Sequence, residues 1–385
     1  MTAVERVRVG DVLRLERRQV QIEPSEPYDE IGVRSFGRGI FHKEPVDGVT
    51  LGNKRVFRIE PGDLVISNVF GWEGAIAVAS RAEAGKIGSH RFMTFVPVDG
   101  RIDTSWAAWF FRGEVGLGLI RKASPGSAGR NKTLAVQRFE DLVIPLPPIG
   151  EQRRVAARLD RTAAAAQRIA SLAARSDAVA TGLRRSLTTP DAEASGWHRV
   201  ALGALVTLNL DQTPVQSTEM YQIAGVYSFG RGLFGRGPID GDQTSYKALH
   251  RLTAGQLVMS RLKAWEGAIA MVDDRFDGWY LSPEFPTFTL DTDAVDSDFF
   301  RAIITSEPFW RSLGGRSKGI GARRERVSAD RLLEQFVDLP PMEVQQRAAR
   351  LLRRVDHMES ARHGFRVRAE AVLPATLNRE FVALR

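Results

Sequence analysis

The pattern of apolar and polar positions divides each half of the chain into two parts. In residues 1–145 and 198–338, short apolar runs follow turn residues, which is typical of strands. These runs are 63–69, 74–80 and 92–98 in the first half and 256–262, 267–273 and 285–291 in the second. Segments that begin at Asp103 and Asp296 combine a capping residue with apolar residues at helical spacing. Both regions therefore predict α+β globules.

A long helix is predicted after each pair of prolines. Residues 150–187 follow Pro147-Pro148, are rich in Ala, Arg and Leu, and contain no proline. Apolar positions recur at steps of four and three both here and after Pro340-Pro341, which predicts a heptad-like seam on each helix. The predicted seam residues are Val155, Leu159, Thr162, Ala166, Ile169, Leu172, Ser176, Val179 and Leu183, and then Leu351, Val355, Met358, Arg362, Phe365, Ala369 and Val372. At 1.5 Å per residue, about 37 helical residues make a rod of roughly 55 Å.

The two halves of the chain are copies of one unit. Residues 35–48, SFGRGIFHKEPVDG, and residues 228–241, SFGRGLFGRGPIDG, are identical at nine of fourteen positions and lie 193 residues apart. The same shift aligns GWEGAIAV with AWEGAIAM and IPLPPIGEQRR with VDLPPMEVQQR. Constant spacing over this length indicates two copies of a domain rather than a solenoid.

The repeat also predicts how the parts connect. About ten residues join the first helix to the second globule, and an extended chain of that length spans at most roughly 36 Å. We therefore expect two helices packed antiparallel in a coiled-coil-like stalk, and a pseudo-two-fold dumbbell with a globule at each end. Two independent globules with unpaired helices are the alternative. The predicted boundaries are 1–148 and 191–341 for the globular domains and 149–190 and 342–385 for the helical spacers.

Composition argues against several classes of protein. The 385 residues include no cysteine, which excludes disulfides, thiolate metal sites and a cysteine nucleophile, and the six histidines are never spaced as His-x-x-x-His. No apolar run of eighteen residues and no signal-like start occur, so we expect a cytoplasmic protein without a membrane span. The phosphate-binding GxxxxGK[ST] loop, the G-x-S-x-G elbow, the amino-methyltransferase tetrapeptide and a repeated carboxylate–lysine set are absent, which favours a binding protein over an enzyme.

The formal net charge of +8 adds a preference for a polyanionic partner, usually nucleic acid. The alternative is that a GC-rich genome supplies Arg and Ala codons without regard to function. Charge alone does not decide between these explanations.

The repeated Gly-Arg-Gly loop is the first candidate site. Glycines let a backbone approach a ligand closely, and Arg38 and Arg231 have the geometry to pair with phosphate or to bind a guanine edge with two hydrogen bonds. Phe36 and Phe229 are expected to anchor the loop in the core. A tight turn between strands with a solvated arginine is the alternative.

The Trp-Glu-Gly turn is also repeated. Trp72 and Trp265 are expected to lie buried beside the hairpin, in preference to stacking on a base. Glu73 and Glu266 either accept a hydrogen bond from a cytosine amino group or satisfy local backbone.

Two basic segments, 121–133 and 311–326, precede the double prolines. They combine glycine, serine and positive charge, which suits a loop that grips phosphate, and Arg130 corresponds to Arg323 across the repeat. A merely solvated loop is the alternative.

The double-proline segments carry a resemblance to a known family. IPLPPIGEQRRVAARLD at 144–160 and VDLPPMEVQQRAARLLRRVD at 337–356 resemble the segments that open the long helices in specificity subunits of type I restriction–modification systems. The resemblance extends over the whole chain, with two recognition domains and two helical spacers. The second copy has Val344 where the first has Glu151, so only Gln152 and Gln345 match.

The resemblance implies a protein without catalysis of its own that reads a bipartite site in double-stranded DNA. It implies that each domain reads one half-site, that the helices set the gap, and that two methyltransferase subunits and optionally two restriction subunits are recruited for phage defence. S-adenosylmethionine, ATP and Mg²⁺ would belong to those partners. We predict DNA contacts at Arg34, Ser35, Gly37, Arg38, Gly39, Lys43, Lys54, Arg55, Trp72, Arg121, Lys122, Arg130, Lys132, Ser228, Gly230, Arg231, Gly232, Arg236, Arg261, Lys263, Trp265, Arg316, Lys318, Arg323 and Arg324. We predict partner contacts at Gln152, Arg153, Gln345 and Arg347.

Because both domains share the Gly-Arg-Gly loop, we also expect the two half-sites to be related and partly inverted. Two rival functions stay open from the sequence. One is a scaffold that binds acidic proteins instead of DNA, and the other is a nuclease hidden in the globules. Steep salt dependence of binding distinguishes DNA recognition from the first, and metal-dependent cleavage identifies the second.

Overall fold

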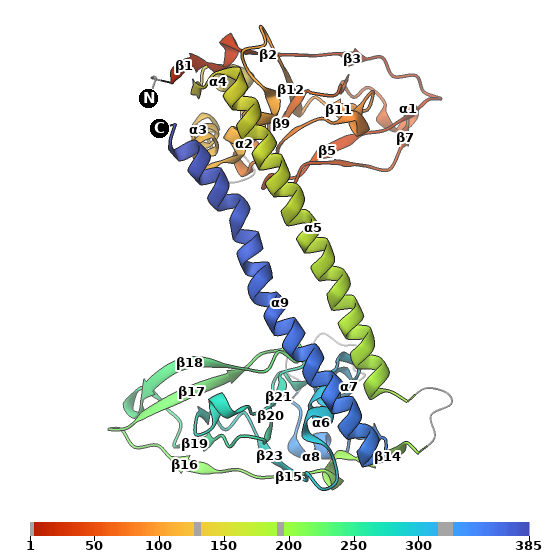
Figure 1. Ribbon diagram of the computed structural model, residues 1–385, viewed down its shortest axis with the longest axis vertical. Coiled ribbons are helices and arrows are strands. Elements are labelled where there is room, and N and C mark those ends of the chain that lie inside the picture. Colours follow the sequence, from red (N-terminus) through yellow and green to blue (C-terminus); the bar gives the residue numbers. More distant parts are fainter. Residues whose placement is uncertain (1–3, 127–131, 191–195, 315–325, 385) are drawn as a thin grey trace. The chain divides into compact units, whose positions relative to one another are not determined.

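The computed structural model describes residues 4–126, 132–190, 196–314 and 326–384. The chain divides into two compact units, with residues 1–172 and 364–385 in unit 1 and residues 173–363 in unit 2. Each unit combines an α+β globule with part of helix α5 (Ile149–Thr188) and part of helix α9 (Met342–Val382) (Figure 1). The predicted α+β class is confirmed.

A four-stranded antiparallel sheet lies at the centre of unit 1. Its strand order is β10-β9-β12-β2, formed by Ile76–Val78, Leu64–Ser67, Phe92–Pro97 and Leu13–Leu15. Three of these strands fall within the predicted runs, and β9 and β10 pair antiparallel across the Trp-Glu-Gly turn. The other strands of unit 1 are β1 (Glu5–Arg8), β3 (Gln19–Val20), β4 (Pro27–Tyr28), β5 (Ile31–Val33), β6 (Ile40–His42), β7 (Val46–Asp47), β8 (Val56–Arg58), β11 (Ile87–Ser89) and β13 (Val143–Leu146).

Unit 2 repeats this sheet at the predicted offset. The order β15-β23-β20-β21 joins Val206–Leu208, Thr287–Leu290, Leu257–Met259 and Ile269–Met271. The second sheet has five strands in the order β16-β19-β22-β17-β18, and β14 pairs with β24. These strands are β16 (Gln212–Pro214), β19 (Ala248–Arg251), β22 (Tyr280–Leu281), β17 (Met220–Val226), β18 (Leu233–Asp240), β14 (His198–Ala201) and β24 (Phe336–Leu339).

Short helices and 3-10 turns complete each globule, and α2 and α6 pack on the central sheets. In unit 1 these are α1 (Gly48–Leu51), α2 (Thr104–Arg112), α3 (Glu114–Ala123) and α4 (Val136–Glu140), with 3-10 turns η1 (Val9–Asp11), η2 (Gly71–Glu73) and η3 (Arg81–Glu83). In unit 2 these are α6 (Ser297–Ile304), α7 (Glu307–Ser312) and α8 (Ala329–Leu333), with η5 (Leu202–Ala204), η6 (Gly241–Gln243), η7 (Ala264–Glu266) and η8 (Asp274–Phe276). The predicted caps are confirmed, because the carboxylate of Asp103 accepts from the backbone N–H of Trp106 and that of Asp296 accepts from Phe299.

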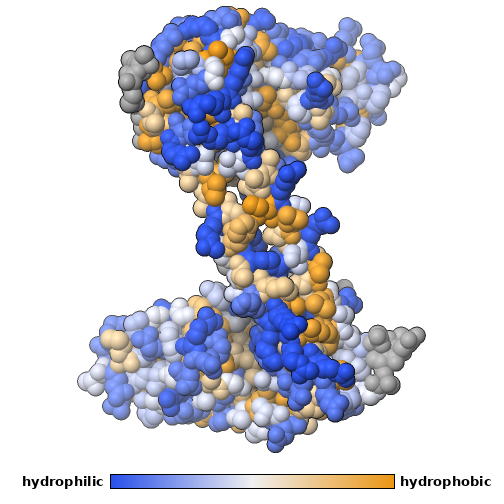
Figure 2. All heavy atoms as spheres, in the orientation of Figure 1, coloured by the Kyte–Doolittle hydropathy of each residue, from blue (hydrophilic) through white to orange (hydrophobic). Residues whose placement is uncertain are grey.

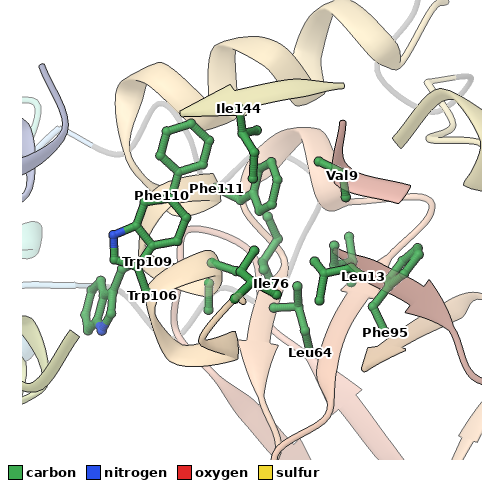
Figure 3. Close-up of a cluster of buried hydrophobic side chains, with 14 of the residues drawn as sticks. Val9, Leu13, Leu64, Ile76, Phe95, Trp106, Trp109, Phe110, Phe111 and Ile144 are labelled. Atoms are coloured by element: carbon green, nitrogen blue, oxygen red, sulfur yellow. The ribbon is translucent and has the colours of Figure 1, made fainter. Parts of the chain in front are cut away.

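The core of unit 1 joins the sheet to α2 and to both long helices. Figure 3 shows aromatic side chains of α2, including Trp106 and Phe110, beside aliphatic side chains of the sheet. Leu159 of α5 and Phe381 of α9 belong to the same buried cluster. The indole N–H of Trp109 donates to Asp160 of α5 at 2.8 Å. The ends of the long helices are therefore structural parts of the globule.

The two long helices run antiparallel. In unit 2, Arg184 of α5 bonds Asp356 of α9 at 2.5 Å, while Asp177, two turns earlier in α5, lies 3.9 Å from Arg362, further along α9. In unit 1, Arg158 near the start of α5 donates to Glu380 near the end of α9 at 2.6 Å. The predicted antiparallel pairing is confirmed, whereas the dumbbell stays a prediction.

The predicted apolar seam is only partly correct. Val155, Leu159 and Val355 are buried. Several other seam positions are exposed: Leu172, Val179, Leu183, Leu351, Met358, Phe365 and Val372 have exposed fractions between 38% and 71%. Val155 and Leu159 belong to the core of the unit 1 globule, and ion pairs join the helices along part of their contact. No helix within the described ranges is both long enough and apolar enough to cross a membrane.

Candidate nucleic-acid interface

The Gly-Arg-Gly loop of unit 1 connects β5 to β6 and lies against the Trp-Glu-Gly turn. The N–H of Phe36 donates to the carbonyl of Glu73 at 2.8 Å, and the N–H of Gly37 donates to the carbonyl of Gly74 at 3.0 Å. The loop closes on itself through Arg34, whose N–H donates to Gly39 O at 2.9 Å. Residues that are 37 positions apart in the sequence therefore form one backbone structure.

The same structure occurs in unit 2. The N–H of Phe229 donates to Glu266 O, and the N–H of Gly230 donates to Gly267 O, both at 2.8 Å. A Cβ added to Gly267 would lie 2.9 Å from the Cα of Phe229, so a glycine is required where the loop and the turn meet. The repeat thus reproduces the geometry of the loop as well as its sequence.

The strand pairs that carry the two loops share a packing arrangement of a glycine and a phenylalanine. A Cβ on Gly32 would meet the ring of Phe41 at 2.3 Å, and one on Gly225 would meet the ring of Phe234 at 2.5 Å. Each phenylalanine ring therefore occupies the space beside the glycine of the neighbouring strand that a Cβ would need. This cross-strand packing fixes the base of each loop.

The expected burial of Phe36 and Phe229 is wrong. Their exposed fractions are 73% and 63%, and both have left-handed backbones with φ of 60° and 65°. The cause is the backbone pairing, which uses the N–H groups of this loop and leaves the side chains directed into solvent.

The two arginines of the loops are also exposed. The Arg38 guanidinium lies 5.9 Å from the Phe36 ring, and Arg231 lies 4.8 Å from the Tyr227 ring. Arg231 donates to the carbonyl of Ser228 at 3.0 Å. Within the described part of the chain, neither arginine forms an ion pair with a carboxylate, so both side chains are available to an anion.

The carboxylate of Glu73 serves the loop rather than an open surface. It accepts from Ser35 Oγ at 2.8 Å, which ties the first residue of the loop to the turn. In unit 2 the corresponding Glu266 is paired with Lys263 at 2.9 Å. The geometry therefore supports a structural role within each unit for both glutamates, rather than a contact with a cytosine amino group.

Trp72 brings further predicted residues to the loop of unit 1. Its indole N–H donates to Val69 O at 2.9 Å, and the ring is half-buried. The amine of Lys132 lies 4.7 Å from the ring centre, and Arg121 donates to the carbonyl of Trp72 at 3.2 Å. Trp265 repeats the indole hydrogen bond, to Leu262 O at 3.1 Å.

The basic segments are anchored beside these turns. The N–H of Leu134 donates to Asn68 O, and the N–H of Val327 donates to Arg261 O, both at 2.8 Å. Asn68 and Arg261 correspond across the repeat, so the anchor is duplicated. Lys122 is exposed at the end of α3. Five predicted residues of these segments lie outside the described residues: Arg130, Arg316, Lys318, Arg323 and Arg324.

The other predicted cations are exposed, either beside the loop of unit 1 or on separate parts of the units. Lys43 lies 3.4 Å from Glu30, and Arg34 lies 4.7 Å from the Phe41 ring. Lys54 and Arg55 lie between α1 and β8, and Arg236 lies on β18. Contacts within the described residues do not connect these last three to the Gly-Arg-Gly loops.

Sequence reasoning missed Arg112, at the end of α2. Its guanidinium donates to the carbonyl of Gly37 at 2.6 Å and lies 4.1 Å from the Trp109 ring. Burial lowers the pKa of Arg112, and the nearby Asp160 carboxylate offsets only part of this effect. Thr305 occupies the corresponding position in unit 2, so the repeat gave no signal for this residue.

The prediction that Gln152 and Gln345 face a partner is wrong, because both are buried in their own units. The amide oxygens accept from the N–H of Asp103 at 2.9 Å and of Asp296 at 3.0 Å. Both amide nitrogens donate to proline carbonyls of the double-proline segments at 2.8 Å. Each glutamine therefore ties the start of a long helix to the cap of α2 or α6. Arg153 and Arg347 are exposed, as a partner contact requires.

Unit 2 also contains a groove of about 1300 Å³ next to its loop. The loop from Gly230 to Gly232, the end of α5 and the start of α6 line it. Several of its charged side chains pair with one another, as Arg301 does with Asp356 at 2.6 Å. The described residues contain no cluster of histidine and carboxylate side chains suited to a metal ion.

Comparison with known proteins places this fold. No protein-family model matches the chain. No curated protein matches it by sequence. Several solved structures match the chain in fold. The HsdS subunit from Thermoanaerobacter tengcongensis is 18% identical, with a TM-score of 0.50 over 99% of this chain and 97% of that chain.

Two further structures agree more closely in shape. A chain from the type I R-M system, in a structure concerned with complex assembly and conformational transition, has a TM-score of 0.61 at 17% identity and covers 99% of this chain and 98% of that chain. The type I restriction–modification S subunit from M. genitalium has a TM-score of 0.61 at 13% identity, covering 98% and 96%. The chain therefore has the fold of the S subunits of type I restriction–modification systems.

Proposed function

We propose that this chain is the specificity subunit of a type I restriction–modification system. In this proposal, domains 1–148 and 191–341 each read one half-site of a bipartite target in double-stranded DNA, and the long helices set the gap. The observation that carries the proposal is the agreement in fold with S subunits over at least 98% of the chain. The duplicated loop supplies each domain with the same reading device.

The loops have the chemistry that base reading requires. Arg38 and Arg231 are exposed and free of carboxylate partners among the described residues, and an arginine bound to guanine O6 and N7 is the commonest specific contact in the major groove. Because both units present this arginine in the same backbone structure, we propose that the two half-sites share bases. The remaining predicted lysines and arginines would position phosphates without reading sequence.

The exposed apolar positions of the long helices support recruitment of partners. Leu351, Met358, Phe365 and Val372 follow one another at steps of seven on α9, and Leu172 and Val179 do so on α5. All six are exposed. Figure 2 shows apolar surface along the long helices. Seven residues are close to two helical turns, so each series forms a stripe suited to a partner helix. We propose that two methyltransferase subunits dock there, with Arg153 and Arg347 as polar contacts.

Catalysis would belong to the partners in this proposal. S-adenosylmethionine would be bound by the methyltransferase subunits, and ATP and Mg²⁺ by restriction subunits where the system has them. The chain would act in the cytoplasm and need no cofactor of its own.

The test is to map methylated adenines in the host genome with and without this chain. Deletion is expected to remove one bipartite motif, and the wild-type chain is expected to restore it. Arg38→Ala and Arg231→Ala are expected to weaken methylation at that motif, whereas Arg14→Ala, another exposed arginine, leaves it unchanged. Methylation that is the same with and without the chain would contradict the proposal. A motif with unrelated halves would contradict only the shared bases.

A further inference from the structure

Phe36 and Phe229 are the non-glycine residues with positive φ within the described part of the chain. A left-handed backbone is unfavourable for a residue with a Cβ, and glycine adopts it freely. Both units nevertheless place a large aromatic residue there. Strained backbone of this kind is found preferentially where it serves function.

Packing does not explain the two phenyl rings. The Phe229 ring has an edge contact with Trp310, 6.1 Å between centres, but Leu117 occupies the position that corresponds to Trp310 in unit 1. What the two copies share is exposure, at 73% and 63%. The loop therefore presents an apolar ring to solvent in both units.

Positive charge accompanies each ring. The Arg38 guanidinium lies 5.9 Å from the Phe36 ring and the Arg231 guanidinium 5.8 Å from the Phe229 ring. An apolar tip with an adjacent cation matches a DNA groove, where the bases offer apolar faces and methyl groups and the backbone offers phosphates. A phenyl ring has no donor or acceptor, so it contacts bases only through apolar surface.

We propose that Phe36 and Phe229 contact bases at equivalent positions of the two half-sites. This inference rests on the proposed function and adds a pair of specificity-determining residues to it. The contact is apolar in either of two forms. The ring packs on a thymine methyl group, or it packs on the face of a base that it partly unstacks.

Glycine substitution tests the proposal without strain. Phe36→Gly and Phe229→Gly remove the ring and suit the left-handed backbone, so the melting temperature is expected to stay the same or rise by a few degrees. The chain is purified in complex with its co-expressed partners. The probe is the duplex that the wild-type complex enriches most from a random pool, and a scrambled duplex measures non-specific binding. Each variant is expected to weaken binding to the enriched duplex by roughly 5- to 150-fold, the range for loss of an aromatic–base contact. Tyr246→Ala, at another exposed aromatic residue of unit 2, is the control.

Two further measurements identify the contact. Replacing the half-site thymines by deoxyuracil weakens wild-type binding but not that of the variant if the ring contacts a methyl group. A 2-aminopurine base brightens with the wild-type complex but not with the variant if the ring unstacks a step. Equal binding by variants and wild type overturns the inference, and so does an equal loss on enriched and scrambled DNA. A wild-type complex that enriches no duplex overturns the proposed function and this inference with it.

Discussion

The end of α9 is part of the core of unit 1, and this gives a prediction about residues far apart in the sequence. Phe381 is 1% exposed, with its ring centre 5.5 Å from that of Phe110 and 5.9 Å from that of Trp106. Truncating a buried phenylalanine to alanine costs about 3–5 kcal/mol, because apolar contact is lost and a cavity remains. A domain is stable by about 5–15 kcal/mol, so Phe381→Ala removes a large share.

The expected effect is a lower melting temperature for unit 1. About 2–4 °C is lost per kcal/mol in a domain of this size, so the midpoint falls by about 6–20 °C. Calorimetry of the full chain measures this fall, and hydrogen exchange locates it in α2 rather than in α6. The neighbouring Val382 is 45% exposed, so Val382→Ala is the matched control. If Phe381→Ala melts like Val382→Ala, the docking of α9 into this core is refuted.

Three further predictions follow from particular contacts. Gly32→Val is expected to displace the ring packed on Gly32 and to destabilise unit 1 by about 1–3 kcal/mol, measured by chemical denaturation. Burial opposes ionisation of Glu83, but hydrogen bonds from Ser80 and His42 outweigh it and lower the pKa of the carboxyl. Glu83 therefore stabilises the fold above its unfolded pKa of about 4.3, and this contribution is lost as the pH falls through the lower folded pKa. In Glu83→Gln, the free energy of unfolding is expected to fall less steeply on acidification than in the wild-type chain. Phe365→Glu is expected to reduce co-purification of methyltransferase subunits, because a charge enters an apolar docking stripe.

Each of these predictions has a comparison that could contradict it. Gly118, where nothing lies within 4 Å of an added Cβ, is expected to tolerate alanine, and a loss as large as that of Gly32→Val would contradict the packing argument. The acid limb of Glu83→Gln is compared with that of the wild-type chain, and an unchanged limb would refute the role of the Glu83 carboxyl. Val367→Glu lies on a different face of α9, so equal loss of partner in both variants would refute a specific stripe.

The repeat made much of the fold predictable. A constant offset of 193 residues meant that strands, caps and helices inferred in one half could be checked in the other. The capping aspartates and the strands around the Trp-Glu-Gly turn are set by local sequence, and they appear where predicted.

The residues whose surroundings were predicted wrongly, or not predicted, are positioned by tertiary contacts. The exposure of Phe36 and Phe229 follows from backbone pairing with a distant turn, which a Gly-Arg-Gly pattern does not reveal. Gln152 matches a family pattern, but its role is to tie two segments together inside the unit. Arg112 is not repeated, so no comparison between the halves pointed to it.

The predicted apolar seam of the long helices was only partly correct for a related reason. Heptad spacing predicts a stripe of apolar residues but not what covers it. The globules cover the stripe near Leu159, whereas positions such as Met358 stay exposed.

Selection of DNA from a random duplex pool, by the chain in complex with its co-expressed partners, tests directly whether the two units read a bipartite target. We expect enrichment of two related half-sites separated by a constant gap, and we expect a change in unit 1 alone to alter one half-site. No enrichment, or enrichment of a single contiguous motif, would mean that the chain does not read two separate half-sites.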